Sequence, residues 1–247
     1  GDSIKPIYNW MVNDTSSPNA GKSITVLNMP FEGVNGSNVS NAIDYSGYGN
    51  DGTITNEDAN VTWNATGGFD GNGSYMFDGS NDFIYLNNNS NLNLGTSNFT
   101  IVAWIKGNSF GSYNRIVSKW NGVADGEKGY ILSMRLGNLS SYIDNANMDM
   151  ISNQSFSTGT WYHVVLVRDG NNAYQYIDGQ LDKSKVLLVS TNASSSVGLH
   201  VGASPDGSLP FDGNIDDLMI FNRSLSASQI WALYTNKSII TFNETSA

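Results

Sequence analysis

Short runs of β-branched and aromatic residues, separated by Gly- and Asn-rich turns, are the feature that most limits how this chain can fold. In 99–106 the alternation places apolar side chains on both sides of an extended segment, which predicts a strand with two partly buried faces. A second run, 161–168, ends at a turn of Asp, Gly and two Asn residues. Asp178-Gly179 follows the run 174–177 and predicts a tight hairpin, because a type I′ turn needs positive φ at both central residues.

Further strands are expected along most of the chain. The segments are 5–12, 23–31, 74–77, 83–86, 115–119, 129–136, an apolar stretch after Gly179 that ends near Val189, 197–201 and 213–221. One helix is expected at 227–234, with Ser226 as its N-cap, Gln229 as the capping-box partner, and Leu225 and Ile230 as a hydrophobic staple. The number and spacing of these segments favour an all-β sandwich.

The composition supports the same fold class. Only 14% of the 247 residues are charged, against roughly 25% in an ordinary domain, and Asn, Ser, Gly and Thr supply the remaining polarity. These residues favour turns and disfavour helices, because Gly and Asn tolerate positive φ and hydroxyls compete for backbone hydrogen bonds. All-β sandwiches of this length commonly form one domain, so one main domain is expected.

Charge and cysteine content exclude several classes of partner. A net charge of −10, without a run of basic residues, would repel nucleic acid. The chain has no cysteine, so neither a disulfide nor a thiolate metal site is available, and aliphatic runs such as 164–167 and 186–189 are too short to span a membrane. Asn-X-Ser/Thr occurs at 14 positions, about twice the chance expectation, which indicates an exported or cell-surface glycoprotein. Simple richness in Asn and Ser is the alternative reading.

Eight short motifs, taken in order, resemble the laminin-G-like, concanavalin A-like lectin/glucanase jelly-roll family. The motifs span residues 29–33, 44–52, 77–84, 99–104, 161–164, 176–179, 211–217 and 221–226. The resemblance covers 23–235 and implies a sandwich of two antiparallel sheets with one short C-terminal helix. It also implies recognition of glycans or proteins, and often a calcium ion near one edge. Residues 1–22 are expected to be the tail of a preceding module or an added edge strand, and 236–247 a linker.

Carried over from this resemblance, Glu32, Asp44, Asn50 and Asp216 are the candidate calcium ligands, with Asp51 and Asp217 in reserve. Calcium binds six to eight oxygen atoms, which Asp-, Asn- and Gly-rich loops supply. Glu32 and Asp216 are expected to converge, because the first and last strands of such a sandwich lie side by side. The ion would stabilise a Gly-rich loop. In the alternative reading, Asp44 and Asp51 only cap turns.

Sugar binding requires an aromatic platform for the apolar face of a pyranose, together with polar groups for its hydroxyls. Trp120 follows a predicted strand and is the first candidate, although core packing is an equal alternative for it. The other candidate ligand-binding residues are Tyr113, Tyr130, Tyr142, Asp125 and Asn145. Trp104, Trp161 and Trp231 are expected to pack in the core, because they lie inside periodic segments.

Catalysis is not expected. The chain has neither a Gly-x-Ser-x-Gly elbow nor the Glu-x-Asp-x-Glu strand motif of laminarinase-type hydrolases, and His163 and His200 are too few for a zinc site. The sequence therefore predicts a non-catalytic, calcium-supported carbohydrate-binding or adhesive module of an exported surface protein. The first alternative is a structural or protein-interaction module, and a glycoside hydrolase is the second. The expected partners are glycans or other surface proteins.

Overall fold

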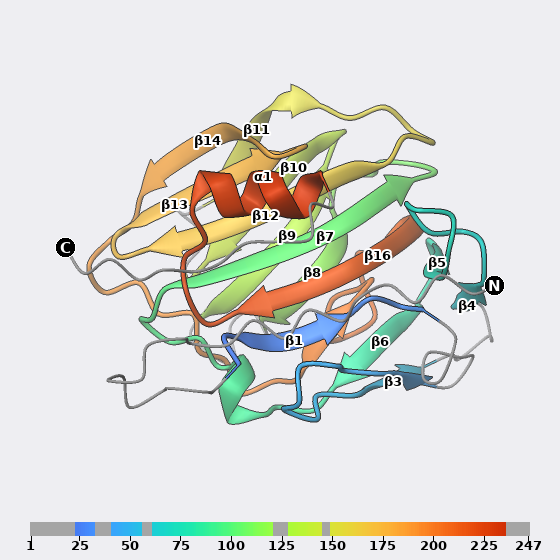
Figure 1. Ribbon diagram of the computed structural model, residues 1–247, viewed down its shortest axis with the longest axis horizontal. Helices are drawn as coiled ribbons and strands as arrows, with labels where there is room; N and C mark the ends of the chain where they lie inside the picture. The colour runs from blue at the N-terminus through green and yellow to red at the C-terminus, as the bar shows by residue number, and fades with distance from the viewer. Residues whose placement is uncertain (1–22, 33–40, 56–60, 121–127, 145–148, 236–247) are drawn as a thin grey trace.

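A computed structural model describes residues 23–32, 41–55, 61–120, 128–144 and 149–235. In this part of the chain the strands form two eight-stranded antiparallel sheets (Figure 1). The expected all-β sandwich is therefore confirmed. The predicted strand at 5–12 and the proposed linker at 236–247 lie outside the described residues.

The first sheet follows the spatial order β14 (Gln180–Val186), β13 (Asn172–Ile177), β12 (Tyr162–Asp169), β7 (Phe99–Gly107), β16 (Asp212–Phe221), β5 (Ser74–Asp78) and β4 (Thr62–Asn64). β1 (Thr25–Met29) also pairs with β16, so the first strand of the described chain lies beside the last, as expected. The second sheet follows the order β11 (Met150–Ser155), β10 (Asn138–Ile143), β9 (Gly129–Arg135), β8 (Asn114–Trp120), β15 (Leu199–Val201), β6 (Phe83–Leu86), β3 (Gly52–Thr55) and β2 (Asn41–Ala42). A short 3₁₀ helix, η1, spans Ser90–Leu92.

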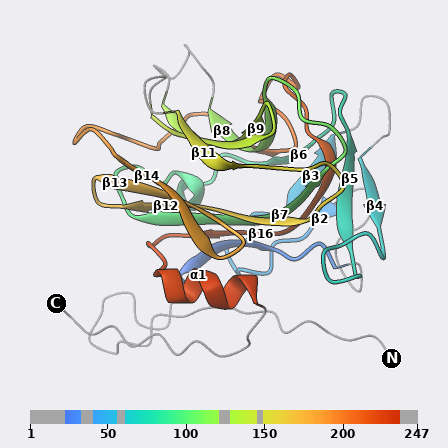
Figure 2. The same ribbon diagram turned by 90° about the horizontal axis from the view of Figure 1, so that it is seen from above.

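The main core lies between the two sheets, where side chains from β7, β8, β9 and β16 bury one face of each strand. A second, smaller cluster covers the opposite face of the first sheet. There Val102 and Val165 of the sheet cluster with Ile230 of α1 (Ala227–Tyr234). Figure 2 shows α1 on this side and the second sheet on the other. β7 is therefore apolar on both faces, as its sequence predicted.

Both local predictions of backbone geometry are confirmed. Ser226 accepts the Gln229 N–H while the Gln229 side chain accepts the Ser226 N–H, which completes the capping box of α1. Asp178 and Gly179 have φ of 49° and 75° and connect the paired residues Ile177 and Gln180, so they form the expected two-residue hairpin.

The tryptophans divide between the core and the surface. Trp104 is buried, with 4% of its surface exposed, and its ring stacks on Phe69 at a centroid distance of 3.3 Å. Trp161 is half-buried beneath the ammonium group of Lys106. Trp231, expected in the core, is 41% exposed on α1, because Ile230 occupies the face of the helix that contacts the sheet.

Sequence patterns did not predict several strands, including β3, β10 and β11. β10 and β11 are rich in Ser and Asn, residues of weak strand propensity, and their extended form depends on pairing with each other and with β9. A strand was also expected to continue to about Val189, but β14 ends at Val186. β14 is an edge strand, and Val186 and Val189 are 75% and 83% exposed.

Candidate ligand-binding face

The outer face of the second sheet, which points away from α1, carries a continuous row of paired residues. Six neighbouring strands contribute one residue each, and the row reads Thr53, Tyr85, His200, Ser118, Ile131 and Tyr142. With strands about 4.8 Å apart, such a row extends roughly 24 Å across the sheet. Ser118 lies near its middle, between His200 and Ile131, and all three of these side chains are buried. Tyr85 and Tyr142 lie on either side of them and are half-buried.

Trp120 extends this row at the end of β8. It lies on the same side as Ser118, two residues earlier, since side chains alternate along a strand. The Trp120 and Tyr142 rings meet edge to face, with centroids 5.8 Å apart and planes at 69°. Both side chains are half-buried, so the pair is fixed by packing while part of each ring remains exposed.

Gly129, opposite Trp120 on β9, permits this arrangement. Its φ is 124°, and an added Cβ would lie 2.0 Å from the Lys119 carbonyl oxygen. Only glycine allows the two strands to approach so closely beside Trp120. A glycine at this point therefore fixes the position of the Trp120 ring.

Two polar atoms on this face have no hydrogen-bond partner among the residues that the structure describes. They are the Ser118 hydroxyl oxygen and the Trp120 indole nitrogen Nε1, and both are buried. An unsatisfied buried donor costs about 1–3 kcal/mol, so native proteins rarely retain one without a reason. The indole N–H is a donor that a hydroxyl-rich ligand would satisfy.

The other half of the row is aromatic and uncharged. The His200 ring lies 5.0 Å from the Phe83 ring and 5.1 Å from the Tyr85 ring, between centroids. Burial lowers the pKa of His200 from its ordinary value, so the imidazole is neutral at neutral pH. Phe83 and Tyr85 are half-buried and add apolar surface to the face.

Tyr113 lies at the opposite end of β8 from Trp120. Its ring contacts two guanidinium groups, with the Arg135 carbon at 5.0 Å and the Arg115 carbon at 5.6 Å from the ring centroid. Arg135 forms an ion pair of 2.5 Å with Asp149, which also accepts a hydrogen bond from Ser140. Sequence patterns did not indicate this cluster, because its members come from separate strands.

The predicted ligand-binding residues therefore separate into three groups. Trp120, Tyr142 and Tyr113 lie on the outer face of the second sheet. Tyr130 has no exposed surface, and its hydroxyl donates to the Leu92 carbonyl in the core, so it is unavailable to a surface ligand. Asp125 and Asn145 lie outside the described residues.

The candidate calcium ligands form two separate networks. In the first, Asp44 is buried, and its two carboxylate oxygens accept four hydrogen bonds, from the backbone N–H groups of Asn28, Ser46 and Asn50 and from the Ser46 hydroxyl. The Asn50 side chain donates to the Val26 carbonyl. Asp51 accepts the N–H of Asp44.

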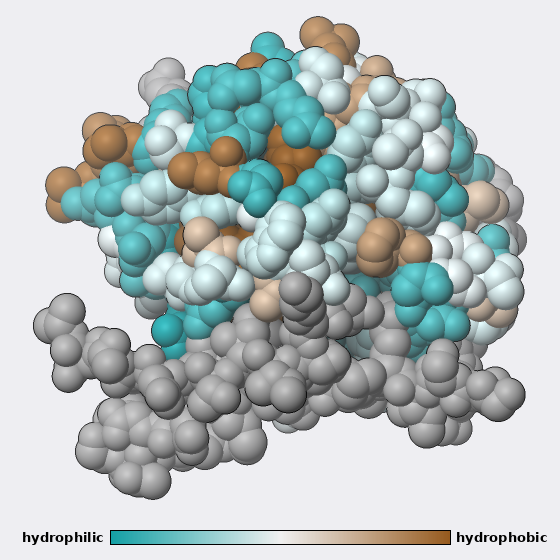
Figure 3. Space-filling model, turned by 45° about the horizontal axis from the view of Figure 1, so that its top comes forward, coloured by the Kyte–Doolittle hydropathy of each residue, from teal (hydrophilic) through white to brown (hydrophobic). Residues whose placement is uncertain are grey.

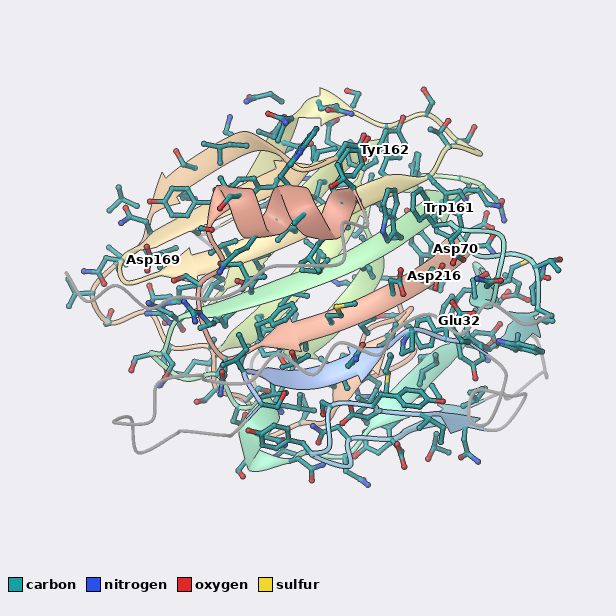
Figure 4. All side chains as sticks on the ribbon, viewed as in Figure 1. Glu32, Asp70, Trp161, Tyr162, Asp169 and Asp216 are labelled. Carbon is teal, nitrogen blue, oxygen red and sulfur yellow. The ribbon has the colours of Figure 1, made fainter. Side chains whose placement is uncertain are left out.

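In the second network, Glu32 and Asp216 converge on the loop 67–73, as Figure 4 shows. Asp216 is fully buried and accepts the N–H groups of Phe69 and Asp217. Glu32 accepts the N–H of Gly73. The expected convergence of these two residues is present, but each binds a backbone amide of the loop.

These contacts do not fit one calcium site. Asp44 uses all four of its lone-pair directions for hydrogen bonds, and Asp216 accepts two backbone amides. Among the described residues, no three His, Cys, Asp or Glu side chains gather closely enough to hold a metal ion. The carboxylates themselves stabilise the loops that calcium was expected to order. Calcium binding by this chain stays a prediction.

The family comparison supports the fold found here. The family model described as the concanavalin A-like lectin/glucanases superfamily matches residues 78–231, which is more than half of the chain. This segment contains most of both sheets and the start of α1. No curated protein sequence matches the chain.

Solved structures with a similar fold include three toxin domains. The binding domain of Paraclostridial Mosquitocidal Protein 1 has a TM-score of 0.67 and 17% identity, over 86% of this chain and 52% of that one. The binding domain of botulinum neurotoxin serotype G has a TM-score of 0.66 and 21% identity, over 86% and 51%. The serotype D ligand binding domain, solved in complex with N-acetylneuraminic acid, has a TM-score of 0.64 and 21% identity, over 86% and 51%.

The chain thus spans about half the length of these solved domains, and at this identity the likeness concerns the fold. The residue landmarks, the two antiparallel sheets and the match over 78–231 agree. The chain belongs to the concanavalin A-like lectin/glucanase superfamily.

Proposed function

We propose that this protein is a non-catalytic carbohydrate-binding module, and that it binds glycans on the outer face of its second sheet. The observation that carries the proposal is the Trp120–Tyr142 pair, whose rings are fixed edge to face at one end of the row that crosses the sheet. An aromatic ring of this kind stacks against the apolar face of a pyranose. The buried Trp120 N–H and the Ser118 hydroxyl add hydrogen-bonding groups beside it.

Glycan-array binding and titration calorimetry with the best ligand test this proposal. Trp120→Ala should lower affinity at least tenfold, because removal of a central aromatic contact costs more than about 1.4 kcal/mol. Trp231→Ala is the matched control, since Trp231 is also partly exposed but lies on α1, beyond the first sheet. Its affinity should equal that of the wild type.

The proposal fails if the array shows no binding, or if the two tryptophan variants lose affinity equally. Both variants need the same secondary structure as the wild type, measured by circular dichroism. Tyr142→Phe is a milder second variant, because it retains the ring that contacts Trp120. Most of the wild-type affinity should remain in it.

The carboxylates described on this face, Asp149 and Asp206, argue against glycoside hydrolysis. A general acid needs a raised pKa, and a retaining enzyme needs two carboxyl groups roughly 5–5.5 Å apart. Asp149 is held by Arg135 and Ser140. The pKa of Asp206 is lowered, chiefly by hydrogen bonds from Ser208, so it is ionised. Release of reducing sugar from a β-glucan by the purified protein would contradict a purely binding role.

A protein-interaction module is the second candidate, and one surface feature favours it. Val186 is the last residue of β14, and Leu188 and Val189 follow it; the three are 75%, 65% and 83% exposed. On the face drawn in Figure 3, exposed apolar residues appear as separate brown clusters among polar ones. Strand addition at the neighbouring edge is hindered, however, because Asp182 accepts the N–H groups of Asn153 and Gln154 on β11. Self-association without glycan binding would favour this alternative.

We further propose that the chain is an exported glycoprotein. Among the described sequons, Asn64 and Asn222 are exposed, so a glycan on either would extend into solvent. None of the helices in the described part of the chain has the length and apolarity needed to cross a bilayer. A mass decrease after enzymatic removal of N-glycans from the native protein would support this proposal, and an unmodified native protein would contradict it.

A further inference from the structure

Arg115 is the one arginine of the outer face whose guanidinium group has no carboxylate partner within 4.0 Å among the described residues. Only 8% of its surface is exposed. It pairs across the strands with Ser133. A buried cation without a partner anion is costly in a protein, so its retention calls for an explanation.

The hydrogen bonds of Arg115 are few and long. Nε donates to the Ser204 hydroxyl and Nη1 to the Ser133 hydroxyl, both at 3.4 Å. The structure gives Nη2 no partner among the described residues. A guanidinium group has five N–H donors in a planar fork that matches a carboxylate or sulfate. Among the described residues, three of the five donors therefore have no partner.

The surroundings orient this group. The Tyr113 ring packs against the guanidinium groups of both Arg115 and Arg135, and Arg135 is already paired with Asp149. Asp206 is the other carboxylate whose charge acts on Arg115. It is exposed, its carboxylate accepts the N–H and hydroxyl of Ser208, and it lies beyond ion-pair distance from Arg115.

We propose that Arg115 binds the carboxylate of an acidic sugar, while Trp120 holds another sugar ring of the same chain. This inference rests on the proposed function and adds the class of ligand. A register shift between Arg115 and Val117 keeps Arg115 on the same face as Trp120. Their paired residues on β9, Ser133 and Gly129, are four positions apart, which corresponds to about 13 Å along the strand. One oligosaccharide that runs along β8 would therefore reach both residues and pass over the buried Ser118 and Ser133.

Titration of the protein with an oligogalacturonate and with its methyl ester tests the inference directly. The two probes share one backbone and differ in charge. The wild type should bind the acid at least roughly tenfold more tightly than the ester, since a bidentate, charge-assisted pair is worth about that factor. This difference in affinity should shrink as salt is raised, because salt screens the pair between Arg115 and the carboxylate. The net charge of −10 supplies no other attraction for an acidic ligand.

Three variants separate Arg115 from its surroundings. Arg115→Met should remove the preference for the acid and leave affinity for the ester unchanged, and Arg115→Lys should retain only part of it, because lysine lacks the planar fork. Asp206→Asn should strengthen acid binding by removing a competing charge. Lys106→Met is the matched control, since Lys106 is a cation of the first sheet that lies over Trp161.

The outcomes distinguish this inference from the proposed function. Equal wild-type affinity for acid and ester, with binding still lost in Trp120→Ala, would overturn the acidic-sugar inference alone. Loss of stability in Asp206→Asn without tighter acid binding would also overturn it, because Asp206 would then be the partner of Arg115. If neither probe nor any arrayed glycan binds, the proposed function itself fails. The comparison of the two probes needs only the wild type, so it does not depend on the folding of any variant.

Discussion

Lys119 and Arg168 extend from opposite sheets and bind the same two loop segments at one end of the sandwich. Lys119, on β8, donates to the Asn88 side-chain oxygen and to the carbonyls of Ser195 and Val197. Arg168, on β12, donates to the carbonyls of Gly95, Thr191 and Gly170. Both side chains are almost fully buried. Residues 88–95 and 191–197 are thus held by side-chain cations surrounded by oxygen atoms.

Lys119→Met should destabilise the protein by about 2–4 kcal/mol. Methionine fills similar space but leaves the carbonyls of Ser195 and Val197 without their donor, and an unsatisfied buried group costs about 1–3 kcal/mol. Urea unfolding followed by fluorescence measures the loss. The control is Lys128→Met, because Lys128 is exposed and should change stability by less than about 0.5 kcal/mol. Equal stability of the two variants would contradict the role assigned to Lys119.

Gly129→Ala should weaken both the fold and the candidate binding face. The new Cβ would lie 2.0 Å from a backbone oxygen, which cannot move away as a flexible side chain can. Strain of this kind costs about 2 kcal/mol or more and displaces Trp120 on the adjacent strand. Gly111→Ala is the control, because its Cβ would meet nothing nearer than 3.4 Å. Thermal melting and glycan affinity should decrease together in the first variant and remain unchanged in the second.

The sequence predicted what is set locally. The hairpin at Asp178 and the capping box at Ser226 depend on residues only two or three positions apart, and both are present. The long apolar strands β7 and β12 were also recognisable, because their runs of apolar residues are continuous.

The candidate face was less accessible to sequence reasoning because it depends on cross-strand register. Tyr130 and Tyr142 are both tyrosines in predicted or observed strands, yet Tyr130 points into the core and Tyr142 outward. A shift of one residue in register reverses this orientation. Ser118 and His200 are neighbours only because β8 pairs with β15, which is distant in sequence. Arg115 is placed beside Ser133 by the pairing of β8 with β9, so no sequence motif marked these residues.

Asp44→Asn should destabilise the protein to the same extent with calcium and with chelator. The carboxylate accepts four hydrogen bonds, and an amide side chain has only one oxygen to offer. The expected loss is about 2–3 kcal/mol, since hydrogen bonds to a charged group are worth about 1.5–3 kcal/mol each. Melting curves of the wild type and the variant, each with calcium and with chelator, test this. A calcium-dependent rise in the wild-type melting temperature that disappears in the variant would instead show that Asp44 serves a calcium site.

His163 should make the fold sensitive to acid. It is 1% exposed, its ring lies near Trp104 and Tyr234, and burial lowers its pKa from 6.5 to about 3. The unfolded chain therefore binds a proton on this residue between about pH 6.5 and pH 3, while the folded protein does not. Stability should fall by about 1.4 kcal/mol for each pH unit in this window, and the contribution is complete above pH 6.5.

His163→Phe should remove this contribution, because phenylalanine does not titrate. The variant and the wild type should differ in free energy of unfolding by an amount that shifts in favour of the variant as the pH is lowered from 7 to 4. His200, whose pKa is also lowered by burial, remains in both proteins and cancels in the difference. Urea unfolding at several pH values gives the comparison. A difference that does not change with pH would mean that His163 is protonated in the folded protein or is exposed to solvent.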